Sequence, residues 1–138
     1  MAVLLMVISG NTVKGDIMTR VIIAGSRSFN DKVFLYKTVD EVLSTITDKD
    51  IEIVHGNCRG ADLLGERYAI DHGLKVIAFP AYWNKFGNKA GYIRNKQMAE
   101  YAQETGGTLI AFPIGESKGT RMMIELAKKH GLSVYVYE

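Results

Sequence analysis

Val21-Ile22-Ile23-Ala24-Gly25-Ser26-Arg27 is the stretch that decides the fold. A continuous apolar run that ends in glycine is typical of a buried parallel strand leaving its sheet at the carboxyl end. A helix-like pattern opens a few residues later. In an open α/β sheet this edge is where ligands bind, because its loops expose backbone N–H groups next to helix N-termini.

The alternation of strand and helix continues along the chain. Apolar residues at helical spacing predict a helix over about 31–47, a second ending near Asp71, a third over about 90–104 and a fourth ending near His130. Further strands are predicted at 51–54, 75–79, 108–112 and 133–137. Five strands, four helices and right-handed crossovers predict an α/β, three-layer Rossmann-like fold with a mostly parallel sheet.

The composition bounds what this protein can do. The chain has 138 residues, 47% of them hydrophobic, so a single domain with its own core is expected. The formal charge of +2 and the scattered basic residues disfavour a broad surface for duplex nucleic acid but leave a local anion site open. A lone cysteine, Cys58, cannot form an internal disulfide, which favours a cytoplasmic location.

Residues 1–18 precede the first core strand and carry no recognisable chemistry. Ala2 to Ile8 is apolar, but it is too short to span a bilayer and follows no basic residue, so no membrane partner is expected. The segment is either an extra strand that turns back as a hairpin at Gly10-Asn11, or an appendage. The ligand-binding domain is expected over residues 19–138.

Two loops have the composition of phosphate-binding turns. Gly25-Ser26-Arg27 offers backbone N–H groups, a hydroxyl and a guanidinium that can bind a phosphate through two parallel hydrogen bonds. After the fourth strand, a second glycine-rich turn from Gly115 to Thr120 leads into a helix N-terminus. Each loop alone is also typical of an ordinary tight turn, with Arg27 in solvent and Thr120 as an N-cap.

The loop after the second strand places two glycines around a helix start. Gly60 and Ala61 let the backbone approach a ligand, and Asp62 lies in the first helical turn, where the dipole favours a carboxylate. Glu66 lies one turn further along the same face, so it either faces the site or lies in solvent. The loop lacks the Gly-Lys-Ser/Thr ending of a P-loop, and no Gly-x-Gly-x-x-Gly follows Gly25.

The third helix and the aromatic loop before it supply the remaining candidates. Arg94 is expected to reach a second anionic group, and Asn95 to orient it or a ribose hydroxyl. Trp83 either stacks on a base or packs on its own loop. The histidines and Cys58 show no metal-ligand spacing, so neither a metal nor a cofactor is expected. The predicted ligand-binding residues are Gly25, Ser26, Arg27, Gly56, Gly60, Ala61, Asp62, Trp83, Arg94, Asn95, Gly115, Gly119 and Thr120.

As an ordered set, these residues resemble the YspA-related branch of the SLOG superfamily over essentially Thr19 to Glu138. The resemblance rests on Gly25-Ser26-Arg27, Gly56-x-x-x-Gly60-Ala61-Asp62 with Glu66, Pro80-Ala-Tyr-Trp83, Ala90-Gly91-x-x-Arg94-Asn95-x-x-Met98 and Gly119-Thr120. These Rossmann-like proteins of bacteria and phages are grouped with the lonely-guy phosphoribohydrolases and the Smf/DprA proteins. The resemblance implies binding of a nucleotide or ADP-ribose-like ligand at the carboxyl edge, and it raises the expectation of a homodimer.

The lonely-guy enzymes cleave the N-glycosidic bond of nucleoside 5′-monophosphates, and this chain resembles them only in part. Arg94 and Met98 match their Arg-Lys-x-x-Met segment, with Asn95 in place of the lysine. Their Pro-Gly-Gly-x-Gly-Thr-x-x-Glu segment ends in a glutamate, where this chain has Met123. The missing carboxylate removes the group expected to stabilise an oxocarbenium-like centre or activate water.

Two functions therefore stay open. The preferred hypothesis is a protein that binds a small nucleotide or a nucleotide-derived ligand, as a signal sensor or a sequestering protein. The alternative is an N-glycosidase acting on nucleoside 5′-monophosphates, with Glu66 and Arg94 as its catalytic residues.

Overall fold

The computed structural model describes residues 18–47 and 50–138. The prediction of an extra strand, hairpin or appendage in residues 1–18 falls almost entirely outside the described residues. In chain order the elements are β1 (Thr19–Gly25), α1 (Lys32–Leu43), β2 (Ile51–His55), α2 (Ala61–Asp71), β3 (Lys75–Ala78), α3 (Trp83–Phe86), the 3₁₀ turn η3 (Gly87–Lys89), α4 (Ala90–Gln103), β4 (Thr108–Phe112), α5 (Lys118–Lys129) and β5 (Ser133–Val136).

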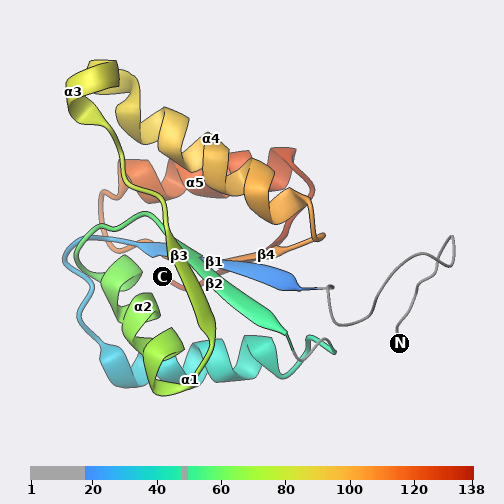
Figure 1. Ribbon diagram of the computed structural model, residues 1–138. Helices are drawn as coiled ribbons and strands as arrows, with labels where there is room; N and C mark the ends of the chain where they lie inside the picture. The colour runs from blue at the N-terminus through green and yellow to red at the C-terminus, as the bar shows by residue number, and fades with distance from the viewer. Residues whose placement is uncertain (1–17, 48–49) are drawn as a thin grey trace, which may run out of the picture.

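The strands form one five-stranded sheet in the order β3-β2-β1-β4-β5. Each neighbouring pair is parallel, and β1 lies in the centre between β2 and β4. Helices cover both faces of the sheet, as Figure 1 shows, with α1 and α2 on one side and α4 and α5 on the other. The predicted three-layer Rossmann-like fold is confirmed.

The apolar run of β1 is buried because each of its two faces packs against a different helical layer. Val21 and Ile23 belong to the core beneath α1 and α2, together with Phe112 of β4. Ile22 and Ala24 belong to the core beneath α4 and α5. Successive residues of a strand point to opposite faces, so a continuous apolar sequence serves both cores.

Two element boundaries differ from the predictions. The first helix ends at Leu43 instead of near 47, because the Ser44 and Thr45 hydroxyls donate to the carbonyls of Glu41 and Val42 and so compete with the helical ladder. The aromatic segment after β3, predicted as a loop, forms the short helix α3, in which the Tyr82 carbonyl accepts from the N–H groups of Lys85 and Phe86.

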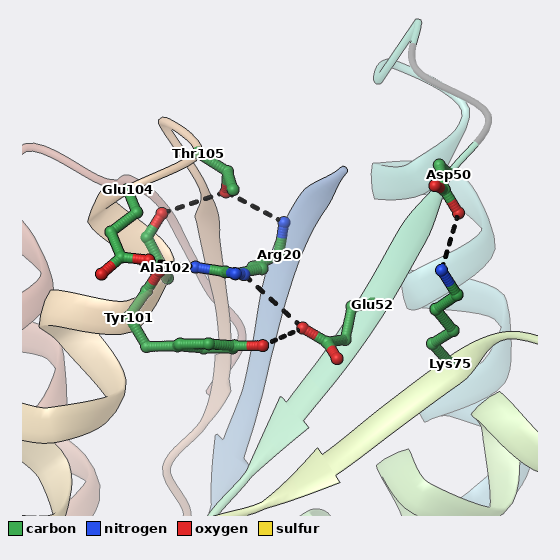
Figure 2. A network of polar contacts seen from close by, with 8 residues as sticks. All are labelled: Arg20, Asp50, Glu52, Lys75, Tyr101, Ala102, Glu104 and Thr105. Carbon is green, nitrogen blue, oxygen red and sulfur yellow. Dashed lines mark hydrogen bonds and ion pairs between the residues drawn. The ribbon is translucent and has the colours of Figure 1, made fainter. Parts of the chain in front are cut away.

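The amino edge of the sheet is held by a dense polar network, drawn in Figure 2. Arg20 of β1 lies over the ring of Tyr101, 3.5 Å from its centroid, and its Nη1 donates to Glu104 Oε1 at 2.7 Å. Its Nε lies 3.5 Å from Glu52 Oε1, and the Tyr101 hydroxyl donates to the same carboxylate. At this edge the polar side chains bind one another.

The carboxyl edge contains the point where the strand order reverses. The chain runs outward from β1 through β2 to β3, then returns to place β4 on the other side of β1. The loops after β1 and β4 therefore diverge, which leaves a crevice where ligands bind in open α/β sheets. None of the helices within residues 18–47 and 50–138 has the length and hydrophobicity that crossing a bilayer requires.

Candidate functional site

Two adjoining cavities open at the carboxyl edge. The first, called lobe 1, has a volume of about 460 Å³ and lies between the loops that follow β1 and β4. The second, called lobe 2, has a volume of about 440 Å³ and lies against the loops that follow β2 and β3. Four residues line both lobes: Arg27, Cys58, Arg59 and Arg94.

Most of the predicted ligand-binding residues meet at these two lobes. Those that line lobe 1 are Gly25, Ser26, Arg27, Asp62, Arg94, Asn95, Gly119 and Thr120. Gly56 and Trp83 line lobe 2, together with Arg27 and Arg94. Gly60, Ala61 and Gly115 line neither lobe, nor does Glu66. The candidates from five separate loops and helix starts thus gather at one edge, as the topology requires.

Ser26 joins the loops that follow β1 and β4. Its hydroxyl donates to the Ile114 carbonyl at 2.9 Å and accepts from the Ile114 N–H at 2.7 Å, and its own N–H donates to the Phe112 carbonyl. The side chain is buried, although it was predicted to bind the ligand. Because its hydroxyl is already paired, Ser26 shapes lobe 1 by fixing both loops.

Three glycines at this edge are required by close packing. A Cβ on Gly25 would lie 2.6 Å from the Ala61 Cβ, and one on Gly60 would lie 2.2 Å from the Ser26 carbonyl oxygen. Gly60 also has φ +86, which L side chains rarely adopt. A Cβ on Gly56 would lie 2.6 Å from Arg94 Nη1, so a side chain there would displace the guanidinium from its place over the loop.

Asp62 is a buried carboxylate at the wall of lobe 1. It is 5% exposed, and its Oδ2 accepts from the Gly56 N–H at 2.8 Å. Burial raises the pKa of the Asp62 carboxyl above its ordinary value, opposed by the Gly56 N–H and by the nearby Arg94 guanidinium. Asp62 lies in the first turn of α2, as predicted. Its hydrogen bond from the Gly56 N–H holds the turn that follows β2.

Glu66 lies one helical turn beyond Asp62 and forms a hydrogen bond with His55. Its Oε2 is 3.0 Å from Nε2 of His55, a fully buried side chain. His55 Nδ1 accepts from the Asn57 N–H at 3.0 Å, so the hydrogen-bond network assigns the ring proton to Nε2, which donates to Glu66. The His55–Glu66 pair lines neither lobe, and through the Asn57 N–H it stabilises the turn that follows β2.

Arg94 lines both lobes, and Asn95 beside it lines lobe 1. Arg94 donates from Nη1 to the Gly56 carbonyl and from Nε to Asn95 Oδ1, the latter at 2.7 Å. Asn95 is 4% exposed and donates from Nδ2 to the Gly119 carbonyl at 3.3 Å. Both predicted residues lie at the site. The two polar atoms of the Asn95 amide form hydrogen bonds to Arg94 and to Gly119 at the start of α5, and so orient both.

The N-terminus of α5 opens into lobe 1. The Arg121 N–H bonds to the Ser117 carbonyl, so the N–H groups of the first three helical residues, 118–120, have no partner within the helix. The Ser117 hydroxyl donates to Thr120 Oγ1 at 2.8 Å and does not cap the backbone. Uncapped N–H groups at the positive end of a helix favour an anion.

The charges around the two lobes are mainly positive. Arg27 and Arg59 are exposed, and within the described part of the chain neither side chain forms an ion pair or a hydrogen bond. With Arg94, Lys118 brings the cations that line lobe 1 to four, and Glu116 is an exposed carboxylate there. The described residues hold no group of three or more His, Cys, Asp or Glu side chains suited to a metal ion.

Sequence reasoning missed several residues that line the lobes. Arg59 lies between Gly56 and Gly60 but was not among the predicted ligand-binding residues, and neither was Cys58, although both residues line both lobes. Ser117 and Lys118 were within the quoted turn but were not singled out. The position of Arg59 and Cys58 in the sequence could have identified them. Glycines at the carboxyl end of a strand let the backbone come close to a ligand, so the residues between two such glycines lie next to that ligand.

Comparison with known proteins identifies the family. The profile of the YspA, cpYpsA-related SLOG family (YAcAr) matches residues 19–86, which hold the elements from β1 to α3. The Gene 61 protein of Mycobacterium phage D29 is 33% identical over 124 residues, covering 85% of this chain and 94% of that protein. The chain belongs to the YspA-related SLOG family. This membership supports a nucleotide-related role.

The comparison with solved structures gives one match to report. The X-ray structure of DNA processing protein A (DprA) from Streptococcus pneumoniae matches with a TM-score of 0.44 and 18% sequence identity. The match covers 88% of this chain and 59% of DprA, so this SLOG protein spans less than two thirds of that chain.

Proposed function

We propose that this SLOG protein binds a nucleotide or a nucleotide-derived small molecule at the carboxyl edge, as a sensor or a sequestering protein. The observation that carries the proposal is the combination of the uncapped α5 N-terminus with Arg27, Arg59 and Arg94 around one cavity. N–H groups at a helix N-terminus and guanidinium groups are both well suited to binding phosphate.

The phosphate would lie against the N–H groups at the start of α5, with Arg27 neutralising its charge. Arg94 would present its free edge, since Nη1 and Nε are already held by Gly56 and Asn95. A guanidinium fixed in this way loses little conformational entropy when it binds, which favours affinity. Trp83 supplies a flat apolar surface for a base.

Binding is proposed in preference to N-glycosidic cleavage. Glu66, the carboxylate of the alternative hypothesis, accepts from His55 outside both lobes. Met123 lines lobe 1 at the position where the phosphoribohydrolase segment has glutamate. The described lining of lobe 1 holds Asp62, already bonded to the Gly56 N–H, and the exposed Glu116 as its only carboxylates.

Calorimetry with AMP, ADP and ADP-ribose tests the proposal. At least one ligand should bind with a dissociation constant below the millimolar range, and Arg27→Ala should weaken it by about 2 kcal/mol, roughly thirtyfold. Arg67→Ala is the matched control, because Arg67 is exposed on α2 and lines neither lobe. Absence of binding by every ligand at millimolar concentration, or equal losses in the two variants, contradicts the proposal.

A further inference from the structure

The cavity at the carboxyl edge has room for more than one organic group. Lobe 1 and lobe 2 have volumes of about 460 Å³ and 440 Å³. Each alone falls within the range of roughly 300–1,000 Å³ that small-molecule pockets occupy. Arg27, Arg59 and Arg94 line both lobes, so the three cations stand at the boundary between the lobes.

An anion at this boundary would meet little competition from the protein. The Arg27 and Arg59 side chains are exposed, and neither forms an ion pair or hydrogen bond with a residue that the structure describes. Arg94 uses Nη1 and Nε on Gly56 and Asn95, which leaves Nη2 for a ligand. Three guanidinium groups in one place match the spread charge of a phosphodiester or a pyrophosphate.

The far ends of the two lobes are each suited to an organic group. Besides the N–H groups at the start of α5, lobe 1 is lined by apolar side chains, including Ala24, Met98 and Met123. Lobe 2 is bounded by Trp83, a residue that is 51% exposed and whose indole lies beside Gly91 of α4. A Cβ on Gly91 would be 3.4 Å from Trp83 Cη2, so the helix supports one edge of the indole and leaves its surface open for stacking.

We infer that the ligand has two organic moieties, one in each lobe, joined by a phosphodiester or pyrophosphate linkage that lies between the three arginines and the N–H groups at the start of α5. This inference rests on the proposed function and narrows its ligand class. A mononucleotide has one nucleoside and fills one lobe. A dinucleotide or another nucleotide conjugate fills both, and it places its internal negative charge where the unpaired cations are.

The test compares diadenosine pyrophosphate with ADP by calorimetry. Both carry a pyrophosphate and adenosine, but the diadenosine compound has less negative charge, so tighter binding cannot come from charge. The diadenosine compound should bind the full chain at least tenfold tighter than ADP. Equal affinities would overturn the inference while leaving the proposed function intact, whereas absence of binding by both would remove both proposals.

Trp83→Ala locates the second moiety. With lobe 2 weakened, both ligands can use only lobe 1, so the tenfold preference should disappear, and it should persist in Tyr82→Ala. Tyr82 is the matched control, since it is 58% exposed beside Trp83 and lines neither lobe. Persistence of the preference in Trp83→Ala would overturn the inference.

The unmodified protein gives an independent measurement, because Trp83 is the single tryptophan of the chain. Its fluorescence should change as diadenosine pyrophosphate saturates the site, and an unchanged emission at saturation would overturn the inference. A single-stranded tetranucleotide that binds tighter than diadenosine pyrophosphate, with a steep dependence on salt, would overturn the small-molecule class.

Discussion

The two edges of the sheet use arginine in opposite ways. At the amino edge, Arg20 lies on the Tyr101 ring, pairs with Glu52 and donates to Glu104 (Figure 2). At the carboxyl edge, Arg27 lies two residues beyond the end of the same strand and is exposed, with no bonded side-chain partner in residues 18–47 and 50–138. Both arginines belong to one short stretch of chain, so their neighbours make the difference.

The difference separates stabilising groups from binding groups. At the amino edge, Arg20 forms hydrogen bonds and an ion pair with other residues of the protein, and these contacts fix β1, β2 and α4 relative to one another. Arg27 and Arg59 at the carboxyl edge remain solvated, which costs the folded state little, and they can transfer their hydrogen bonds to an anion. What holds the carboxyl edge in shape is backbone packing around glycines and the hydroxyl of Ser26.

The largest expected effect tests whether glycine packing holds the carboxyl edge. Gly60→Ala should destabilise the protein by roughly 3 kcal/mol, because the added methyl meets the Ser26 carbonyl oxygen at 2.2 Å and the residue has φ +86. Urea unfolding followed by circular dichroism measures the loss. The matched control is Gly119→Ala at the start of α5, where a Cβ has no atom within 4 Å.

The control should be neutral or stabilising by up to about 1 kcal/mol, since alanine favours a helix more than glycine does. Its methyl group would project into open space at lobe 1, so nucleotide affinity is the property that should fall. Similar stability losses for the two variants would mean that the loops after β2 and β4 are equally packed, and the contrast between them would be lost.

The next effect tests the two arginines directly. Arg20→Met should cost about 2 kcal/mol, because it leaves the mostly buried Glu52 carboxylate without its cation. Arg27→Met should change stability by no more than about 0.5 kcal/mol, because the exposed guanidinium has no partner to lose.

Thermal and urea unfolding of the two variants, with nucleotide titration of each, measure both properties at once. Arg20→Met should retain nucleotide affinity at temperatures where it is folded, and Arg27→Met should lose it. A marked stability loss in Arg27→Met would show that Arg27 is bonded in solution, and the comparison of the two edges would fail.

The fold could be predicted because its signals are local. The run from Val21 to Gly25 and the glycine at its end place β1 without any information on contacts, and β4 lies at residues 108–112 as predicted. The convergence of the loops follows from parallel strands sharing one edge. The segment at Trp83 was mistaken for a loop, because four helical residues are too few to show a period.

The roles of single side chains at the site could not be predicted, because they depend on contacts between distant loops. Ser26 has the hydroxyl of a phosphate ligand, but it bonds to Ile114, 88 residues away. Asn95 has the amide of a ribose ligand, but it bonds to Gly119. Polar residues with a nearby backbone partner support the site, and those without one, such as Arg27, remain available to a ligand.

The smallest expected effect concerns Asp62, which resembles Glu52 in being mostly buried but forms no ion pair within the described residues. Burial raises the pKa of Asp62 in the folded state, so the folded protein binds this proton more tightly than the unfolded chain does. The stability that the protonated group contributes is present below its unfolded pKa and is lost as pH rises through the folded pKa.

Urea unfolding between pH 3.5 and 7 should therefore show the native protein losing stability relative to Asp62→Asn as pH increases. Glu116→Gln controls for the loss of one carboxylate from the rim of lobe 1. The opposite slope would mean that Arg94 and the Gly56 N–H outweigh burial, and that Asp62 is paired in the manner of Glu52.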